Sequence, residues 1–171
     1  MSESLSHLPL MKAQVLGALL FLVVIPLVFI GVDRLVALPW YVDTPLLRAT
    51  SIPLALLGAL FTIWSNVVLV RHAHGSALHG VGLSVGPESR VLLVDGPYRL
   101  CANPMLFGIT CLYLALAFAM DSMSVALLSC LFLAFMIWEV KTFEVPRLRR
   151  DFGEAYEHYR SRTPFLIPGL L

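Results

Sequence analysis

The sequence predicts an all-α, polytopic membrane protein with about four transmembrane helices, and two observations lead to this. Of its 171 residues, 58% are hydrophobic and 13% charged, and the mean hydropathy of +0.84 lies above the range of soluble globular domains. The apolar residues also gather in uncharged runs near the length that crosses a bilayer. We expect residues 1–171 to form a single domain with spans near residues 13–32, 52–70, 104–120 and 122–138.

The first two runs have the length of ordinary transmembrane helices. Pro26 and Pro53 interrupt or start them, and proline is tolerated there because neighbouring helices satisfy the freed carbonyl groups. The N-terminal sequence "MSESLSHLPLMK" lacks the charged start, short apolar core and small-residue cleavage site of a secretory signal. We therefore expect the first run to remain in the mature protein.

The last two runs, at residues 104–120 and 122–138, predict a helical hairpin. Each is at the short limit for a span, and a single charged residue, Asp121, separates them. A tight turn at Asp121 is expected. The hairpin could be thin, tilted or partly re-entrant.

The distribution of Lys and Arg predicts the orientation. With four spans, one of the 12 basic residues precedes the first span, three lie in the loop at residues 71–103 and six follow the last span. Ten of them thus share one side, which the positive-inside rule makes cytoplasmic. Both termini are predicted to be cytoplasmic, in the cytoplasmic (inner) membrane. The formal net charge of +1 gives no basic field for a nucleic-acid partner.

The polar loop and the tail carry the remaining structural signals. In "SRVLLVDGPYRL" a short apolar run ends at Asp95-Gly96-Pro97, which predicts a turn because Gly96 can take a positive φ. In the tail, Pro146 starts or kinks an amphipathic helical segment. Its apolar side carries Leu148, Phe152, Tyr156 and Tyr159, and its polar side carries Arg147, Arg150, Asp151 and Glu154. This segment would lie against the membrane or fold over the loop.

Several chemical motifs favour structural interpretations. The three cysteines, Cys101, Cys111 and Cys130, indicate packing rather than disulfides or zinc binding. The histidines of the HxHxxxxH pattern, His72, His74 and His79, fit an interface with lipid headgroups better than a metal site, and no metal is predicted. Glu139 and Glu144 lie at the end of the last predicted span, where a carboxylate is costly unless it pairs with a cation or belongs to a functional site. Either could pair with Arg99, Arg147 or Arg150.

Two segments on either side of the hairpin together resemble a known family. They are "GPYRLCANPMLFG" and "FEVPRLRRDFGEAYEHYRSRTPFLIP", which are similar to the C-terminal signature of the isoprenylcysteine carboxyl methyltransferase and phospholipid methyltransferase superfamily. The resemblance covers Asp95 to Pro168, and "FGEAYEHY" at this distance from "GPYR" is its most specific part. It implies a small integral membrane enzyme that binds S-adenosylmethionine without a Rossmann domain and methylates a lipophilic acceptor.

Carried over to this chain, the resemblance implies a cofactor pocket built from residues 95–168. The first half would consist of Gly96, Pro97, Tyr98, Arg99, Asn103, Pro104, Met105 and Gly108. Glu144, Tyr156 and Tyr159 would close it, and Arg99 and Glu144 would be its catalytic residues. The sequence departs from the family pattern at Ala102 (usually Arg), Leu106 (usually Tyr) and Val145 (usually Glu). A non-catalytic membrane scaffold with a degenerate pocket is the alternative that these departures leave open.

The remaining residue types suit the chemistry that the resemblance implies. The cofactor has a carboxylate, an ammonium, an adenine and a sulfonium, for which a guanidinium, a carboxylate, an amide and aromatic rings are appropriate partners. Methyl transfer needs alignment and desolvation, and a general base such as His158 or Glu144 only for an amine or thiol acceptor. The acceptor could be a prenylated cysteine carboxylate, a phospholipid headgroup or a small hydrophobic metabolite, reached from the surrounding membrane lipids. The oligomeric state is left open.

Overall fold

The computed structural model describes residues 8–36, 38, 44–73 and 91–170, and in these residues the fold is all-helical. Three helical stretches are long and apolar enough to cross a membrane, Gln14–Val36, Pro45–His72 and Met123–Phe152, and a shorter apolar helix covers Pro104–Ala119. The predicted polytopic all-α class is thus confirmed. The chain is an integral membrane protein.

The first stretch is one continuous helix made of α2 (Leu8–Leu19), the π-helical turn η1 (Leu20–Val24) and α3 (Ile25–Val36). It extends beyond the predicted span at both ends, so Asp33 and Arg34 are helical rather than in a loop. The π turn lies directly before Pro26, and the backbone N–H of Ile25 donates to the oxygen of Leu20, five residues earlier. The extra residue in this turn gives room to the proline ring, which clashes with the preceding turn of an ordinary α-helix.

The second stretch consists of α4 (Thr44–Val68) and the π turn η2 (Leu69–Ala73). The predicted start at residue 52 is wrong by about two turns, and Arg48, which was expected in the loop, lies inside α4. Pro45 is in the first turn of this helix, where the missing N–H of proline costs no hydrogen bond. The start was predicted too late because the prediction followed the uncharged run. Arg48 interrupts that run without interrupting the helix.

The hairpin of α5 (Pro104–Ala119) and α6 (Met123–Glu139) confirms the prediction closely. Asp121 occupies the turn with a φ of 49°. Ser122 then caps α6, its hydroxyl accepting a hydrogen bond from the backbone N–H of Val125 at 3.0 Å. With 16 residues, α5 is about 24 Å long, shorter than the hydrocarbon layer of about 30 Å.

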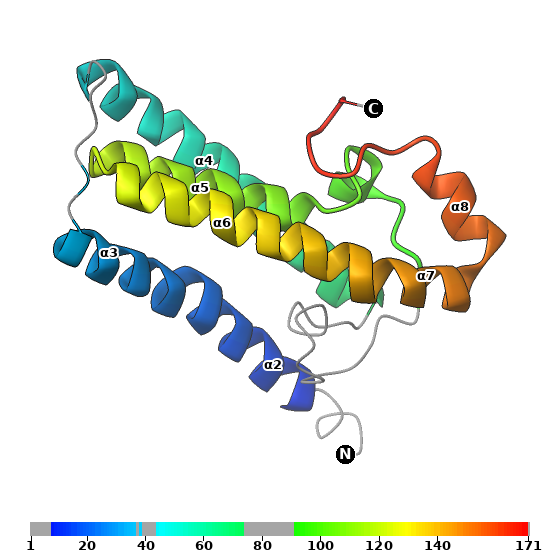
Figure 1. Cartoon of the computed structure of the whole chain (residues 1–171). Coiled ribbons are helices and arrows are strands. Elements are labelled where there is room, and N and C mark those ends of the chain that lie inside the picture. The colour runs from blue at the N-terminus through cyan, green and yellow to red at the C-terminus, as the bar shows by residue number, and fades with distance from the viewer. Residues whose placement is uncertain (1–7, 37, 39–43, 74–90, 171) are drawn as a thin grey trace.

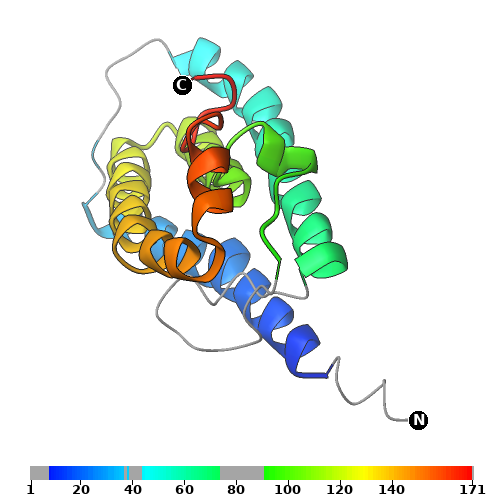
Figure 2. The same cartoon turned by 90° about the vertical axis from the view of Figure 1, so that its right-hand side faces the viewer.

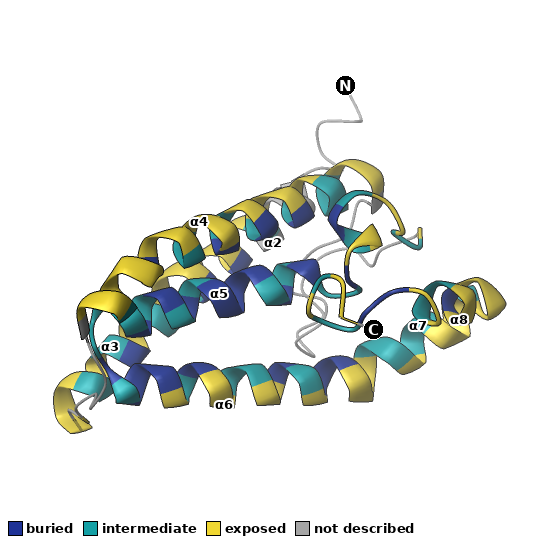
Figure 3. Ribbon diagram, turned by 90° about the horizontal axis from the view of Figure 1, so that it is seen from above, coloured by how far each residue is buried: buried dark blue, intermediate teal, exposed yellow. Residues whose placement is uncertain are grey.

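The short helix α5 is the centre of the bundle. It packs between α4 and α6, and α3 packs against α6 (Figure 3). Phe21 and Phe29 from the first stretch meet Tyr113 of α5, whose hydroxyl donates to the backbone oxygen of Phe21 at 2.6 Å. The side chains of α4 and α6 that point outward are apolar and exposed, as is appropriate for lipid contact.

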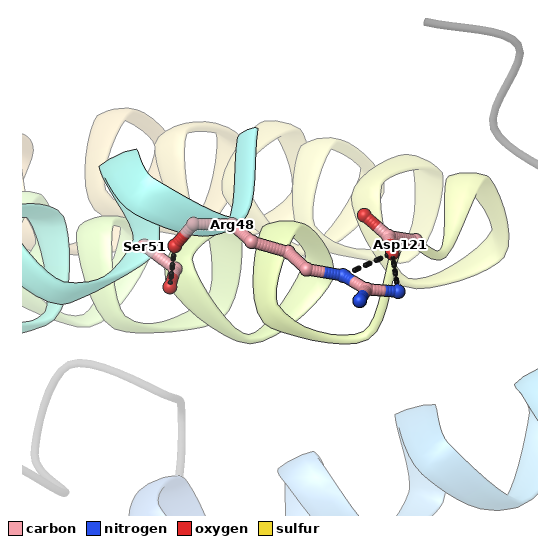
Figure 4. Close-up of polar contacts among 3 residues, drawn as sticks. All are labelled: Arg48, Ser51 and Asp121. Atoms are coloured by element: carbon pink, nitrogen blue, oxygen red, sulfur yellow. Dashed lines mark hydrogen bonds and ion pairs between the residues drawn. The ribbon is translucent and has the colours of Figure 1, made fainter. Parts of the chain in front are cut away.

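The connecting end of the bundle is held by polar contacts. Arg48 of α4 forms an ion pair with Asp121 in the hairpin turn, and its backbone oxygen accepts from the Ser51 hydroxyl at 2.6 Å (Figure 4). Ser122 donates to the carboxylate of Asp33. These contacts fix the α5–α6 turn against the ends of α3 and α4.

At the other end, α6 continues into the tail through a third π turn, η5 (Val140–Glu144), followed by α7 (Val145–Phe152) and α8 (Glu154–Arg160). The tail was predicted as one amphipathic helix, and this is wrong. Gly153, with a φ of 52°, separates α7 from α8, because this left-handed conformation ends a helix and favours glycine. The start of α2 and the tail lie at the same end of the bundle (Figure 1).

Candidate active site

The GPYR sequence forms a short 3-10 helix, η4 (Gly96–Arg99), which packs on the last turns of α4. Gly96 has a φ of 61°, as the turn chemistry predicted. A Cβ at this position would lie 3.3 Å from Val68 Cγ2 and 3.5 Å from Trp64 Nε1. Gly96 therefore allows both the turn and the close approach of the loop to α4.

The C-terminal tail binds directly to this loop. The Tyr159 hydroxyl donates to the backbone oxygen of Tyr98 at 2.7 Å. The backbone N–H of Ala102 donates to Pro164 O, and Asn103 Nδ2 donates to Phe165 O, both at 2.8 Å. We call residues 163–168 the strap. Figure 2 shows α8 and the strap lying across the end of the bundle beside the loop that leads into α5.

Glu144 lies among three tyrosines. Burial raises the pKa of the Tyr98 hydroxyl well above its usual range, and the negative charge of Glu144 raises it further. Burial also raises the pKa values of Tyr156 and Tyr159, and Glu144 contributes to both. The rings of Tyr156 and Tyr159 lie 6.5 Å apart between centroids. We refer to Glu144, Tyr98, Tyr156 and Tyr159 as the tyrosine cluster.

The two predicted catalytic residues differ in their surroundings. Glu144 ends the π turn and lies 3.9 Å from Arg147 Nη2, with its side chain 31% exposed. Its pairing with Arg147 had been considered from the sequence. Arg99 ends η4 with an exposed side chain. A carboxylate and a guanidinium thus border the same loop.

Three further predicted residues shape the start of α5. Asn103 precedes the helix and directs its amide to the strap, while Pro104 is buried at the first helical position. Met105 packs against the hydrophobic core. The N-terminus of α5 therefore points toward the loop and the tail.

Gly108 lies apart from the tyrosine cluster, in the contact between α4 and α5. A Cβ there would come within 2.5 Å of Thr62 Oγ1, 2.7 Å of Thr62 N and 2.8 Å of Gly58 O. Close helix packing explains the glycine at this position. Pro97, also in the predicted set, is buried within η4.

At two of the positions that depart from the superfamily pattern, the backbone forms a hydrogen bond. Ala102 contributes its backbone N–H to the strap, and this contact does not depend on its side chain. Val145 donates its backbone N–H to Val140 O across the π turn, directly before Pro146. Both positions are structurally accommodated.

Other residues of this region were not predicted. Cys101 is fully buried, with 0% exposure, in the loop, and burial raises the pKa of its thiol to about 11. Phe165 and Thr163 belong to the strap, and the two prolines of "TPFLIP" are the signal by which a non-helical segment could have been predicted there. Two members of the three-histidine pattern, His74 and His79, lie outside the described residues. Of this pattern, His72 is exposed and its Nδ1 lies 3.2 Å from Val68 O.

Comparison with known families decides the classification. The sequence profile described as phospholipid methyltransferase matches residues 47–155, well over half of the chain. The chain belongs to the phospholipid methyltransferase family. The match runs from α4 through the hairpin to the first residues of α8. It includes the loop and Glu144 and ends just before Tyr156 and Tyr159. Neither the curated proteins nor the solved structures yielded a match to this chain.

As a member of this family, the protein is an S-adenosylmethionine-dependent methyltransferase of the membrane. The residues of this family member fit that cofactor chemically. Its sulfonium and ammonium are cations, which suit the Glu144 carboxylate and the negative faces of tyrosine rings. Its carboxylate suits Arg99 and the free N–H groups at the N-terminus of α5.

Proposed function

We propose that the protein binds S-adenosylmethionine between the GPYR loop and the tail, and methylates a lipophilic acceptor that arrives from the bilayer. The observation that carries this proposal is the convergence of Tyr98 with Glu144, Tyr156 and Tyr159. These residues are far apart in the sequence and meet at one end of a bundle whose outer surface is apolar. Such a place is accessible from water and from lipid.

In this proposal different residues of the chain bind different parts of the cofactor. Glu144 and the cluster rings hold the positively charged part of the cofactor. Arg99 and the N-terminus of α5, which begins with Pro104 and Met105, hold the carboxylate. Gly96 and Pro97 shape the loop, Asn103 holds the strap against it, and Gly108 supports the site by seating α5 against α4.

The electrostatics of the cluster support a role in cation binding. Tyrosine hydroxyls are neutral at physiological pH, and the raised pKa values of Tyr98, Tyr156 and Tyr159 keep them neutral at still higher pH. Glu144 therefore brings the negative charge. The cofactor supplies a methyl group already activated by positive sulfur. The chain aligns the reactants and excludes water, and the buried Cys101 and the half-buried Tyr98 help to do so.

The acceptor determines whether a base is required. A carboxylate acceptor needs none, whereas an amine needs its proton removed. Glu144 is the better placed of the two candidates, because His158 is exposed on α8 and away from the cluster's buried side. We further propose that the site faces the cytoplasm of the inner membrane, where the cofactor is made available, since most basic residues lie at this end.

Calorimetric titration of the detergent-solubilised chain with S-adenosylmethionine tests the proposal. We expect micromolar binding, and at least a tenfold loss of affinity in Glu144→Gln, because charge-assisted contacts contribute about 1.5–3 kcal/mol. Glu154→Gln is the matched control, an exposed glutamate on α8. Equal affinity of Glu144→Gln and the wild type would refute this site.

A second experiment identifies the acceptor class. The purified protein is incubated with methyl-labelled cofactor and a membrane lipid extract, and the lipid fractions are separated. Label is expected in one lipophilic fraction and absent with Glu144→Gln. Label confined to water-soluble products would contradict a lipophilic acceptor.

A further inference from the structure

Two cations contact the same aromatic ring beside the proposed site. Lys141 Nζ lies 5.3 Å from the centroid of the Phe165 ring, and Arg160 Cζ lies 5.4 Å from it. Lys141 belongs to the π turn η5, Arg160 ends α8, and Phe165 is in the strap. Three separate segments therefore converge on this point.

The arrangement is held in place by the backbone. Phe165 O accepts from Asn103 Nδ2 at 2.8 Å, which ties the ring to the start of α5. Arg160 Nη1 donates to Thr163 O at 3.2 Å, which directs the guanidinium toward the strap. The two cations are thus positioned by the fold.

The depth of Lys141 in the membrane is indicated by its aromatic neighbours. Trp138 and Phe143 are 55% and 54% exposed, and their rings meet edge-on with centroids 5.8 Å apart. Exposed aromatic residues at the end of a membrane helix are typical of the bilayer interface. Lys141 lies between them in the sequence and is therefore at the level of the lipid headgroups.

Lys141 and Arg160 take no part in the ion pairs formed among the described residues. The cations of those pairs are Arg48, Arg147, Arg149 and Arg150. Two like charges held near one ring repel each other, and the low dielectric of the interface strengthens the repulsion. A bound anion would remove this cost.

We propose that Lys141 and Arg160, aligned by Phe165, bind the phosphate of a membrane phospholipid. At headgroup depth the phosphate is the abundant anion, and a guanidinium with an ammonium is a suitable donor set for it. The acyl chains would lie along the exposed apolar face of α6. This site does not require the bound lipid to be the methyl acceptor. It adjoins the tyrosine cluster, because Arg160 directly follows Tyr159 and its charge acts on Tyr156 and Tyr159.

Lipid binding in the absence of cofactor tests this inference. The full chain in detergent is titrated with dioleoyl phosphatidylglycerol, and the lipid retained is measured by native mass spectrometry. We expect Lys141→Gln combined with Arg160→Gln to weaken binding about tenfold or more. Arg149→Gln combined with Arg150→Gln removes the same charge from exposed positions of α7 and should change affinity less than about twofold.

Phe165→Leu provides a second variant, should the double variant fold poorly. It keeps an apolar side chain but removes the ring that aligns the cations, and we expect an intermediate loss of lipid affinity. Folding of each variant is checked by its melting temperature.

Four outcomes would overturn the inference. The first is an equal loss of lipid affinity in both double variants, and the second is equal binding of dioleoylglycerol, which has no phosphate. The third is displacement of the lipid by inorganic phosphate at a similar concentration. The fourth is weaker cofactor binding with unchanged lipid binding in the Lys141→Gln and Arg160→Gln double variant. Because cofactor is absent from the lipid titration, a failure of the proposed methyl transfer would not affect its result.

Discussion

At the scale of single residues, the site depends on a few hydroxyl and amide groups that join segments far apart in the sequence. Tyr159 is the clearest case, because its hydroxyl binds the backbone oxygen of Tyr98, 61 residues earlier. Its neighbour Tyr156 is also buried. Among the described residues, no hydrogen bond involves the Tyr156 hydroxyl. Variants of the two tyrosines therefore separate the effect of the hydrogen bond on stability from the effect of ring packing.

Tyr159→Phe should destabilise the protein by about 1 kcal/mol, because the Tyr98 carbonyl loses its donor while the ring remains. The melting temperature in detergent should fall, and the tail should become more sensitive to protease. Tyr156→Phe is the control and should melt close to the wild type. A larger shift in Tyr156→Phe than in Tyr159→Phe would contradict this assignment.

Cys101 should be unreactive at neutral and mildly alkaline pH. Its pKa is raised to about 11, so the neutral thiol persists to higher pH than usual and the thiolate is about a hundredfold rarer at pH 8 than for an ordinary cysteine. In a variant with Cys111→Ala and Cys130→Ala, iodoacetamide labelling should rise steadily up to about pH 11. Labelling that reaches half of its maximum near pH 9 would show that Cys101 is not buried.

At the scale of elements, the contact between α4 and α5 decides where the loop can sit. Gly58 and Gly108 face each other across it, and a Cβ on either would collide with backbone atoms of the other helix. Small residues are what allow membrane helices to approach closely. The same contact supports η4, which packs on α4, so helix packing and site geometry are connected.

Gly108→Ala should therefore destabilise the bundle by about 1–3 kcal/mol, as overpacking does in a close-packed core. Gly31→Ala is a matched control in α3, since a Cβ there meets nothing within 4 Å and alanine favours the helix. Melting curves in one detergent compare the two variants. Equal melting temperatures would mean that α4 and α5 are not in close contact.

The elements were predictable from the sequence to different degrees. The hairpin was predicted almost to the residue, because Asp121 is the one charge in a long apolar stretch. The beginning of α4 was not, because Arg48 can reach Asp121 at the membrane surface while remaining helical. Gly153 was taken as part of one amphipathic helix, because periodicity alone does not report its positive φ.

At the scale of the whole molecule, successive helical stretches run in alternate directions, so that the start of α2 and the tail lie at the site end of the bundle. The loop and the tail are consequently on the same side and can meet. The family resemblance predicted this meeting through Glu144 and the tyrosines. The contribution of the strap came only with the structure. Its contacts with the loop are a backbone hydrogen bond from Ala102 and a side-chain hydrogen bond from Asn103, and such contacts leave no periodic signal in a sequence.

This topology can be tested by labelling single cysteines, introduced into a variant without native cysteines. Lys12→Cys and Ser161→Cys should be protected from an impermeant reagent added to intact cells, while Ala119→Cys near the hairpin turn should react. All three positions are exposed in the structure. Reaction of Lys12→Cys and Ser161→Cys on opposite sides would contradict four crossings.

The π turn before Pro146 also determines which way the tail faces. It fits one extra residue into a single turn, which the i→i+5 hydrogen bond from Val145 to Val140 closes. Replacing it by an ordinary α turn, one residue shorter, would still leave a helix that crosses the bilayer. The ring of Pro146 would then clash with the preceding turn and bend the helix between Glu144 and the tail, so insertion into the membrane and competence of the site would become separable properties.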